Sequence, residues 1–178
     1  MQIFSAHMRF DPSCGERWTS YIQWSGYHQL SELVSIDDML CPRILEELID
    51  DDWQFNIHAD FKTYFFTDVE YLKRRIGYDP ARHNLLSLVE RPDVPTVPQT
   101  NFELCGYDIL DSYDDVSVLT NCGGFPSIFD ASEVNHYGLL DSLTRALDVA
   151  AKLRDAEPND PHCGDCRVWS ICRYAGAE

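Results

Sequence analysis

The sequence lacks the long hydrophobic run that a membrane-spanning helix needs. No stretch approaches about 20 consecutive apolar residues, the length that crosses the hydrocarbon core of a bilayer. The first residues, MQIFSAHMRFDPSCGE, also lack a basic segment followed by an apolar one, so we expect no secretory signal there. These two absences predict a cytoplasmic protein that does not bind membranes.

Cysteine is too sparse for a disulfide scaffold. Seven cysteines in 178 residues are about 4% of the chain, below the share of roughly 8–10% that marks such proteins. We therefore expect reduced thiols, most of them buried as small apolar side chains. The length and a hydrophobic share of 44% predict a single globular domain over residues 1–178.

Positive charge is scarce as well. Fourteen Lys and Arg residues stand against thirty Asp and Glu residues, which gives a net charge of −16. The excess is strongest in residues 92–166, which carry 3 basic and 14 acidic side chains. A chain of this charge repels nucleic acid and attracts a basic protein. Acidity also keeps proteins soluble, and this plainer interpretation stays open.

The motifs of common active sites are missing. The chain has no nucleophile elbow, no Gly-rich phosphate loop, no H-E-x-x-H motif and no paired-carboxylate signature. The sequence therefore predicts a protein that is not an enzyme.

Potential metal ligands gather only near the C-terminus, in PHCGDCRVWSICRY. A C-x₂-C pair can offer two thiolates to one zinc ion, and the candidate ligands are His162, Cys163, Cys166 and Cys172. No second, distant ligand pair accompanies them, and Cys172 also fits the alternation of a β-strand, so we expect no cofactor. A metal- or thiol-dependent regulator or enzyme built on this cluster is the alternative function. A structural or adaptor subunit is the second alternative.

Hydrophobic periodicity predicts an α+β fold, an antiparallel or mixed β-sheet with helices packed on one face. Strand patterns cover residues 2–10, 83–90 and 166–174, and helix patterns cover residues 41–53, 67–77 and 137–155. Thr67 and Glu70 have the spacing of a capping box. Two apolar runs around the acidic turn DSYDD predict a hairpin of central strands over residues 102–122, with Cys105 opposite Cys122.

Acidic and aromatic side chains are the candidates for a partner surface. Three aspartates, residues 50–52, follow the first predicted helix, where the helix dipole opposes negative charge. Aromatics recur at every third residue from 18 to 27, and Trp and Tyr dominate the energetics of interfaces. The candidate contacts are Asp50, Asp51, Asp52, Asp111, Asp114, Asp115, Trp18, Tyr21 and Trp24.

The stretch FELCGYDILDSYDDVSVLTNCGG, with the Asn-His-Tyr-Gly-Leu-Leu entry to the next helix, resembles small acidic immunity proteins of bacterial polymorphic and contact-dependent toxin systems. The resemblance covers residues 102–155 and carries over no individual binding residue. It implies a non-enzymatic protein that neutralises a basic partner, a toxin domain, by masking it.

Overall fold

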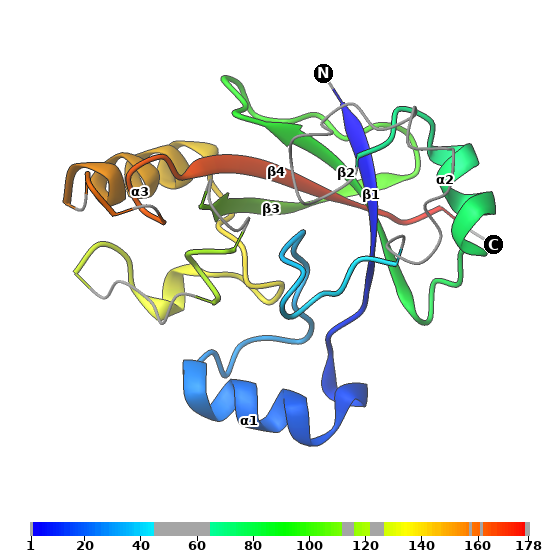
Figure 1. Ribbon diagram of the computed structural model, residues 1–178, viewed down its shortest axis with the longest axis horizontal. Coiled ribbons are helices and arrows are strands. Elements are labelled where there is room, and N and C mark those ends of the chain that lie inside the picture. Colours follow the sequence, from blue (N-terminus) through cyan, green and yellow to red (C-terminus); the bar gives the residue numbers. More distant parts are fainter. Residues whose placement is uncertain are drawn as a thin grey trace.

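The computed structural model describes residues 2–44, 65–111, 116–121, 127–156, 158–160 and 162–176. Within them, four strands form one antiparallel sheet in the order β1-β2-β4-β3 (Figure 1). The strands are β1 (Ile3–Met8), β2 (His83–Glu90), β3 (Phe102–Leu110) and β4 (Arg167–Tyr174). The last strand of the chain therefore lies inside the sheet, paired with β2 on one side and β3 on the other.

Helices and short turns complete the described part of the chain. They are η1 (Pro12–Cys14), α1 (Glu16–Ser25), α2 (Val69–Ile76), η3 (Ala131–Glu133) and α3 (Leu143–Ala156). This arrangement confirms the predicted α+β class with an antiparallel sheet.

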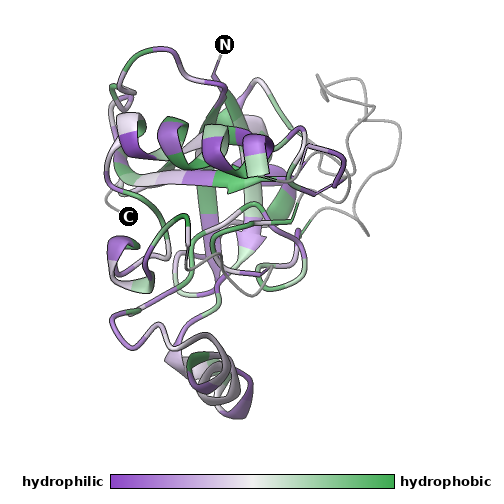
Figure 2. Ribbon diagram, turned by 90° about the vertical axis from the view of Figure 1, so that its left-hand side faces the viewer, coloured by the Kyte–Doolittle hydropathy of each residue, from purple (hydrophilic) through white to green (hydrophobic). Residues whose placement is uncertain are grey.

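Helices α2 and α3 cover the same face of the sheet. Leu72 of α2 packs with Ala6 and Leu85, and Val149 of α3 packs with Ile109. Paired residues share a face and alternate residues along a strand point to opposite faces. The register from β1 through β2 and β4 to β3 therefore places these strand residues on one side. Helix α3 lies across the sheet with alternating hydrophobic and hydrophilic bands (Figure 2).

Helix α1 lies apart from the sheet (Figure 1). Its buried Trp18 and Tyr21 pack on Phe10, which follows β1, with ring centroids 5.4 and 5.6 Å from that of Phe10. The segment whose local structure the sequence left open is thus a helix, and Trp18 and Tyr21 lie on its buried side, whereas Trp24 is exposed. Gly26 ends the helix in a left-handed conformation, where glycine avoids the steric cost of a side chain.

The predicted hairpin over residues 102–122 is wrong in its second arm. Strand β3 forms, but Ser117 makes a single bridge to Leu110 and a turn follows, so the ladder partner of β3 is β4. β3 is therefore an edge strand of the described sheet rather than a central one, and Tyr107 and Leu140 exchange two backbone hydrogen bonds across that edge. The pairing of Cys105 with Cys122 lies outside the described residues.

Gly106 permits the close approach at this edge. A side-chain Cβ there would lie 2.8 Å from Leu140 O and 2.7 Å from Leu139 Cβ, and the residue has φ +144°. Only glycine fits both conditions. The segment around Leu140 forms this bridge, so α3 begins at Leu143 and not at the predicted residue 137.

A helix was predicted over residues 41–53, of which the structure describes only residues 41–44. Arg43 bridges to His7 of β1, so the first part of this range is extended rather than helical. Residues 45–64 lie outside the described residues.

The cap of α2 is Asp68, not the predicted Thr67. The Asp68 carboxylate accepts from the backbone N–H groups of Glu70 (2.9 Å) and Tyr71 (3.0 Å), and Thr67 is exposed one position earlier. An aspartate at this position accepts hydrogen bonds from two backbone donors and its charge is favourable at the positive end of the helix dipole. Asp68 alone therefore caps the helix, in place of the predicted Thr67 and Glu70 capping box.

We predict that Asp68→Ala lowers the free energy of unfolding by about 0.5–2 kcal/mol, because two backbone donors lose their acceptor. Thr67→Ala is the matched control and should stay within about 0.5 kcal/mol of the parent, as exposed substitutions do. Urea unfolding measures both. A larger loss for Thr67→Ala than for Asp68→Ala would restore Thr67 as the cap.

Candidate functional site

The aromatic candidates are divided between core and surface. Trp18 and Tyr21 are buried, and the Tyr21 hydroxyl donates to Thr120 O (2.9 Å), so neither ring is free to anchor a partner in this conformation. Trp24, one turn after Tyr21 on α1, is 59% exposed. Of the three predicted aromatic anchors, the structure leaves Trp24 at the surface.

The acidic candidates divide in the same way. Asp111 is buried, and its carboxylate lies 3.0 Å from His162 Nδ1, so it joins the end of β3 to the loop before β4. The prediction that Asp111 is a surface contact is therefore wrong. The other five acidic candidates, Asp50, Asp51, Asp52, Asp114 and Asp115, lie outside the described residues.

The C-terminal His and Cys side chains do not converge on one point. Cys163 and Cys166 pack in the same hydrophobic core, whereas His162 turns to Asp111. Cys172 lies six residues beyond Cys166, which is about 20 Å at roughly 3.3 Å per strand residue. Across the described ranges, no three His, Cys, Asp or Glu side chains are grouped so that they could hold a metal ion.

Burial also makes these thiols poor nucleophiles. It raises the pKa of Cys166 to about 11 and that of Cys172 to about 11. Reactive cysteines need a lowered pKa, because the thiolate is the reacting species. At neutral pH both thiols are protonated, and they act as small apolar side chains.

Two buried carboxylates form a polar network where β3 ends. Asp108 Oδ2 accepts from Ser35 Oγ (2.7 Å) and Asp108 Oδ1 accepts from Ser117 Oγ (2.6 Å). Asp37 Oδ2 accepts from Ser117 N (3.1 Å) and Asn121 Nδ2 (2.9 Å). The network ties the loop at 35–37 and the turn at 117–121 to β3.

Burial makes ionisation of this network unfavourable. Desolvation raises the pKa of Asp108 to about 6, against the hydrogen bonds from Ser117 and Ser35, and also raises the pKa of Asp37. Perturbed carboxylates often mark active sites. Both side chains here are fully buried, so no substrate reaches them in this conformation.

A further buried carboxylate, Glu32, joins β2, β4 and the segment after β1 at the other end of the same face. Its oxygens accept from Arg9 Nε (2.8 Å), Asn84 Nδ2 (2.8 Å) and Arg173 Nη1 (2.9 Å). Arg9 follows β1, Asn84 belongs to β2 and Arg173 to β4. Burial of a charge is tolerable when it is paired and fully hydrogen-bonded.

Ser5 and His7 have the contacts of a nucleophile and its base but lie in the interior. Ser5 Oγ is 2.9 Å from His7 Nε2, and His7 Nδ1 donates to Cys41 O (2.8 Å). Both side chains are fully buried, and desolvation lowers the pKa of His7 to about 4. The pair fixes the loop at Cys41 against β1 and offers nothing to a ligand from outside.

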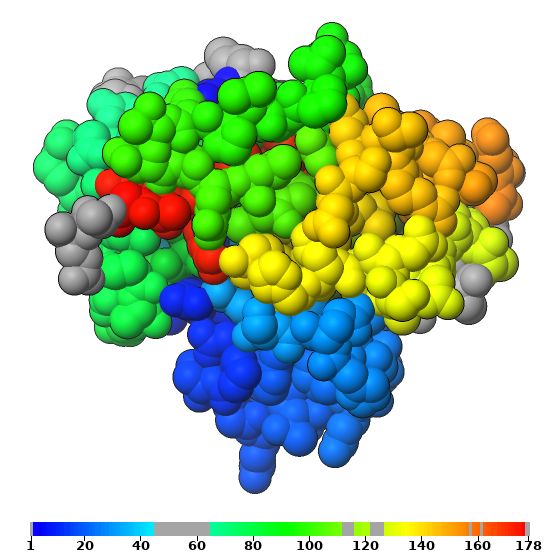
Figure 3. All heavy atoms as spheres, turned by 180° about the vertical axis from the view of Figure 1, so that it is seen from behind, coloured from blue at the N-terminus to red at the C-terminus, as the bar shows by residue number. Residues whose placement is uncertain are grey.

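Four carboxylates gather around Arg145 of α3, three of them exposed and Glu133 half-buried. We call Asp130, Glu133, Asp141 and Asp148 the acidic surface. Arg145 Nε donates to Glu133 Oε2 (2.6 Å), and Arg145 Nη1 pairs with Asp148. Asn135 Nδ2 donates to Asp141 Oδ1 (2.7 Å). Residues 127–142 and α3 form one continuous face in the yellow and orange part of Figure 3.

Three of these carboxylates have a lowered pKa. The hydrogen bond from Arg145 lowers the pKa of Glu133 to about 2, and hydrogen bonds from Ser132 lower the pKa of Asp130. Hydrogen bonds from Lys152 and then Arg145 lower the pKa of Asp148. The charges of Asp130, Glu133 and Asp148 therefore persist to lower pH than those of ordinary carboxylates.

The acidic surface adjoins the part of the chain that follows α1. Gln29 Nε2 donates to Ala131 O (2.7 Å) and to Val134 O (3.2 Å), and Ser31 N donates to His136 O (2.9 Å). In Figure 3 the blue segment of α1 and its following loop lies directly below the yellow one. Helix α1, which carries the exposed Trp24, and the loop after it thus adjoin the segment of the acidic surface.

Comparison with known proteins identifies no relative. No family model, no curated protein and no solved structure matches this chain. Among the described helices, none is both long and apolar enough to cross a membrane.

Sequence reasoning missed the acidic surface, although one signal for it was present. Asp141 and Asp148 stand seven residues apart, which places them two turns apart on one side of a helical pattern. The sequence did not indicate the contribution of η3, because Glu133 pairs with Arg145, which stands twelve positions later in the chain.

The buried network predicts how stability depends on pH. Asp108 has a folded pKa of about 6, above the ordinary 3.8, so it removes about 3 kcal/mol of stability as pH rises from about 4 to 6. His7 has a folded pKa of about 4, below the ordinary 6.5, so it adds about 3 kcal/mol over a similar window. The two contributions oppose each other.

We predict that Asp108→Asn makes the free energy of unfolding rise more steeply with pH between 4 and 6, by about 3 kcal/mol over that window, because the Asp108 contribution no longer opposes that of His7. Urea unfolding at several pH values measures this. Asp108→Ala removes the same titration and should show the same steeper slope, but it should lie about 1–3 kcal/mol below Asp108→Asn at every pH, because the two serine hydroxyls lose their acceptor. An unchanged slope in Asp108→Asn would contradict the shifted pKa.

Proposed function

We propose that this chain is a non-enzymatic acidic protein that binds and masks a basic protein partner. Charge is the observation that supports this most directly. Thirty acidic residues stand against fourteen basic ones, and the described acidic surface stays ionised because hydrogen bonds lower the pKa of three of its four carboxylates. Fixed negative charge of this kind raises the rate of association with a basic partner and disfavours other partners.

The proposal does not require all of the formal charge to lie at the surface. Glu32, Asp37, Asp108 and Asp111 are buried and count within the net −16. Glu32 is paired with two arginines, and burial raises the pKa of Asp37 and Asp108. The acidic surface and the aspartates at 50–52, which the sequence assigns to the partner, therefore supply the steering charge.

Trp24 provides the apolar part of the proposed interface. A single tryptophan that is 59% exposed is a suitable central contact, because Trp is enriched among the residues that dominate binding energy. The resemblance to immunity proteins suggests that the partner is a bacterial toxin domain whose basic cleft is covered by this side of the molecule. Masking of this kind needs no catalytic group.

The partner is first isolated by chemical cross-linking in the cells that produce the chain, and we expect a strongly basic protein. We predict that Asp141→Asn with Asp148→Asn slows its association with that partner about three- to tenfold at 0.01 M salt. The difference should shrink at 0.15 M, where the screening length falls from about 30 to 8 Å. Stopped-flow mixing measures the rates.

The matched control is Asp68→Asn with Glu70→Gln on α2, which removes the same charge from a remote exposed position. This variant should associate at nearly the parent rate. A rate that depends neither on salt nor on the acidic-surface substitutions would reduce the acidity to a means of solubility and contradict the proposal. A neutral or acidic preferred partner would do the same.

A further inference from the structure

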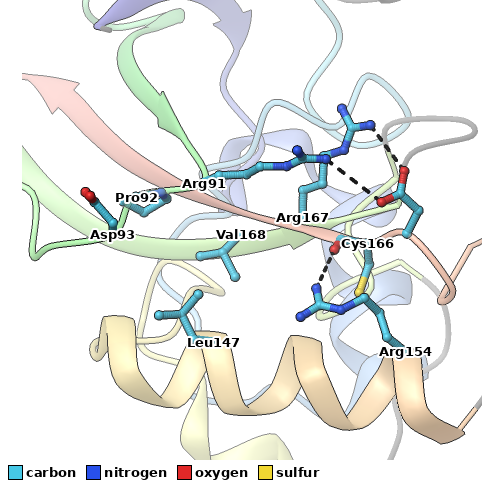
Figure 4. A pocket seen from close by; sticks show the side chains of 9 residues that line it. Arg91, Pro92, Asp93, Leu147, Arg154, Cys166, Arg167 and Val168 are labelled. Carbon is cyan, nitrogen blue, oxygen red and sulfur yellow. Dashed lines mark hydrogen bonds and ion pairs between the residues drawn. The ribbon is translucent and has the colours of Figure 1, made fainter.

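A hollow with a positive rim lies between α3, the first residues of β4 and the loop that leaves β2. It has a volume of about 670 Å³, within the range of roughly 300–1,000 Å³ that small-molecule sites occupy. Pro92, Leu147 and Val168 give it an apolar lining. Leu147 of α3 and Val168 of β4 point toward one another there (Figure 4). Leu147 is 41% exposed, whereas Pro92 and Val168 are buried beneath it, so Leu147 is the apolar side chain that the hollow opens to solvent.

Three arginines surround the hollow in a chain that has only fourteen basic residues. Arg167 is engaged, because it lies 3.0 Å from Glu90 and 3.2 Å from Asp165. The guanidinium of Arg91 makes only loose ion pairs, 3.9 Å from the same two carboxylates. Arg154 Nη1 donates a hydrogen bond to Cys166 O (2.9 Å). The guanidinium groups of Arg91 and Arg154 therefore keep donors for a further acceptor.

The backbone holds Arg91 at this rim in an unfavourable conformation. Its φ of +49° lies in the left-handed region, which among the described non-glycine residues only Asn101 shares. The Arg91 N–H donates to Val168 O (2.8 Å), which ties the strained residue to β4. Such strain costs stability and is concentrated at functional sites. A glycine or asparagine would adopt this positive φ at a lower cost. The presence of an arginine here therefore points to a role for its side chain.

The charges define the ligand. Asp93 also lines the hollow, but its carboxylate points away from the three arginines in Figure 4. Three guanidinium groups then face two carboxylates, Glu90 and Asp165, which leaves one positive charge. A planar guanidinium matches a carboxylate with two parallel hydrogen bonds. The apolar lining beside it suits a hydrocarbon body.

We infer that this hollow binds a small amphipathic monocarboxylate, with the carboxylate on Arg91 and Arg154 and the apolar body against the exposed Leu147. The inference is independent of the acidic surface, which lies around Arg145. A dianionic phosphate would exceed the single uncompensated charge of the site. The ligand is held by charge and shape, and no chemical step is involved.

Octanoate is the probe, and its binding is followed by the shifts of backbone amide signals in NMR spectra. We expect saturable binding with a Kd of about 1 mM or tighter, with the largest shifts at Arg91, Leu147 and Val168. Octanamide has the same chain without the charge and should bind at least tenfold more weakly. Arg91→Asn should weaken octanoate at least tenfold while the protein stays folded, because asparagine tolerates a positive φ. Arg154→Gln should weaken it as well.

Arg82→Gln is the matched control, since Arg82 is an exposed arginine before β2 and does not line the hollow. It should leave octanoate binding unchanged. The inference is overturned if no saturable shift appears up to about 10 mM, or if octanamide binds as tightly as octanoate. It is also overturned if Arg91→Asn and Arg154→Gln bind octanoate like the parent. None of these outcomes bears on the protein partner.

Discussion

The position of β4 between β2 and β3 is the constraint on which the rest of the structure depends. Residues 167–174 are the last strand of the chain, yet they carry backbone pairing on both sides. The sheet is incomplete until they insert, because β2 and β3 do not pair with each other and each of them pairs with β4. Such non-local pairing slows folding, because loop-closure entropy is lost before the contacts form. It also explains why β4 is almost entirely buried at its centre.

Insertion of β4 decides the fate of the residues around it. Cys166 enters the core beside α3, Cys172 turns to the helix-covered face of the sheet, and His162 is drawn to Asp111. On the opposite face, Arg173 brings a positive charge to the buried Glu32. A group of residues that looks like one ligand set in sequence is thus distributed over three separate environments. The physical cause is the extended strand, which separates residues instead of gathering them.

The sequence predicted elements better than it predicted their partners. Hydrophobic patterns predicted strands β1, β2 and β4. Gly77 marked the end of helix α2. The hairpin failed because two consecutive apolar runs do not specify which strand lies beside them. Here β4 competes successfully for β3, and Ser117 is diverted to hydrogen-bond with Asp108.

The candidate site shows the same limit. Composition gave the sign of the charge, but it could not tell that Glu32 and Asp108 are buried while Asp141 and Asp148 are exposed. The aromatic period identified a cluster, yet the choice of Trp24 as the exposed ring depends on the face that α1 turns to Phe10. The hollow at Arg91 left no motif, because its residues come from three distant parts of the chain.

We assign partner binding to the acidic surface and to the adjoining helix α1, which carries the exposed Trp24. Hydrogen–deuterium exchange of the chain, with and without its cross-linked basic partner, tests that assignment most directly. We predict that protection on binding is concentrated in peptides covering residues 127–148 and the end of α1, with α2 unchanged. Protection concentrated on α2 and the strands beside it, with none over residues 127–148, would contradict it.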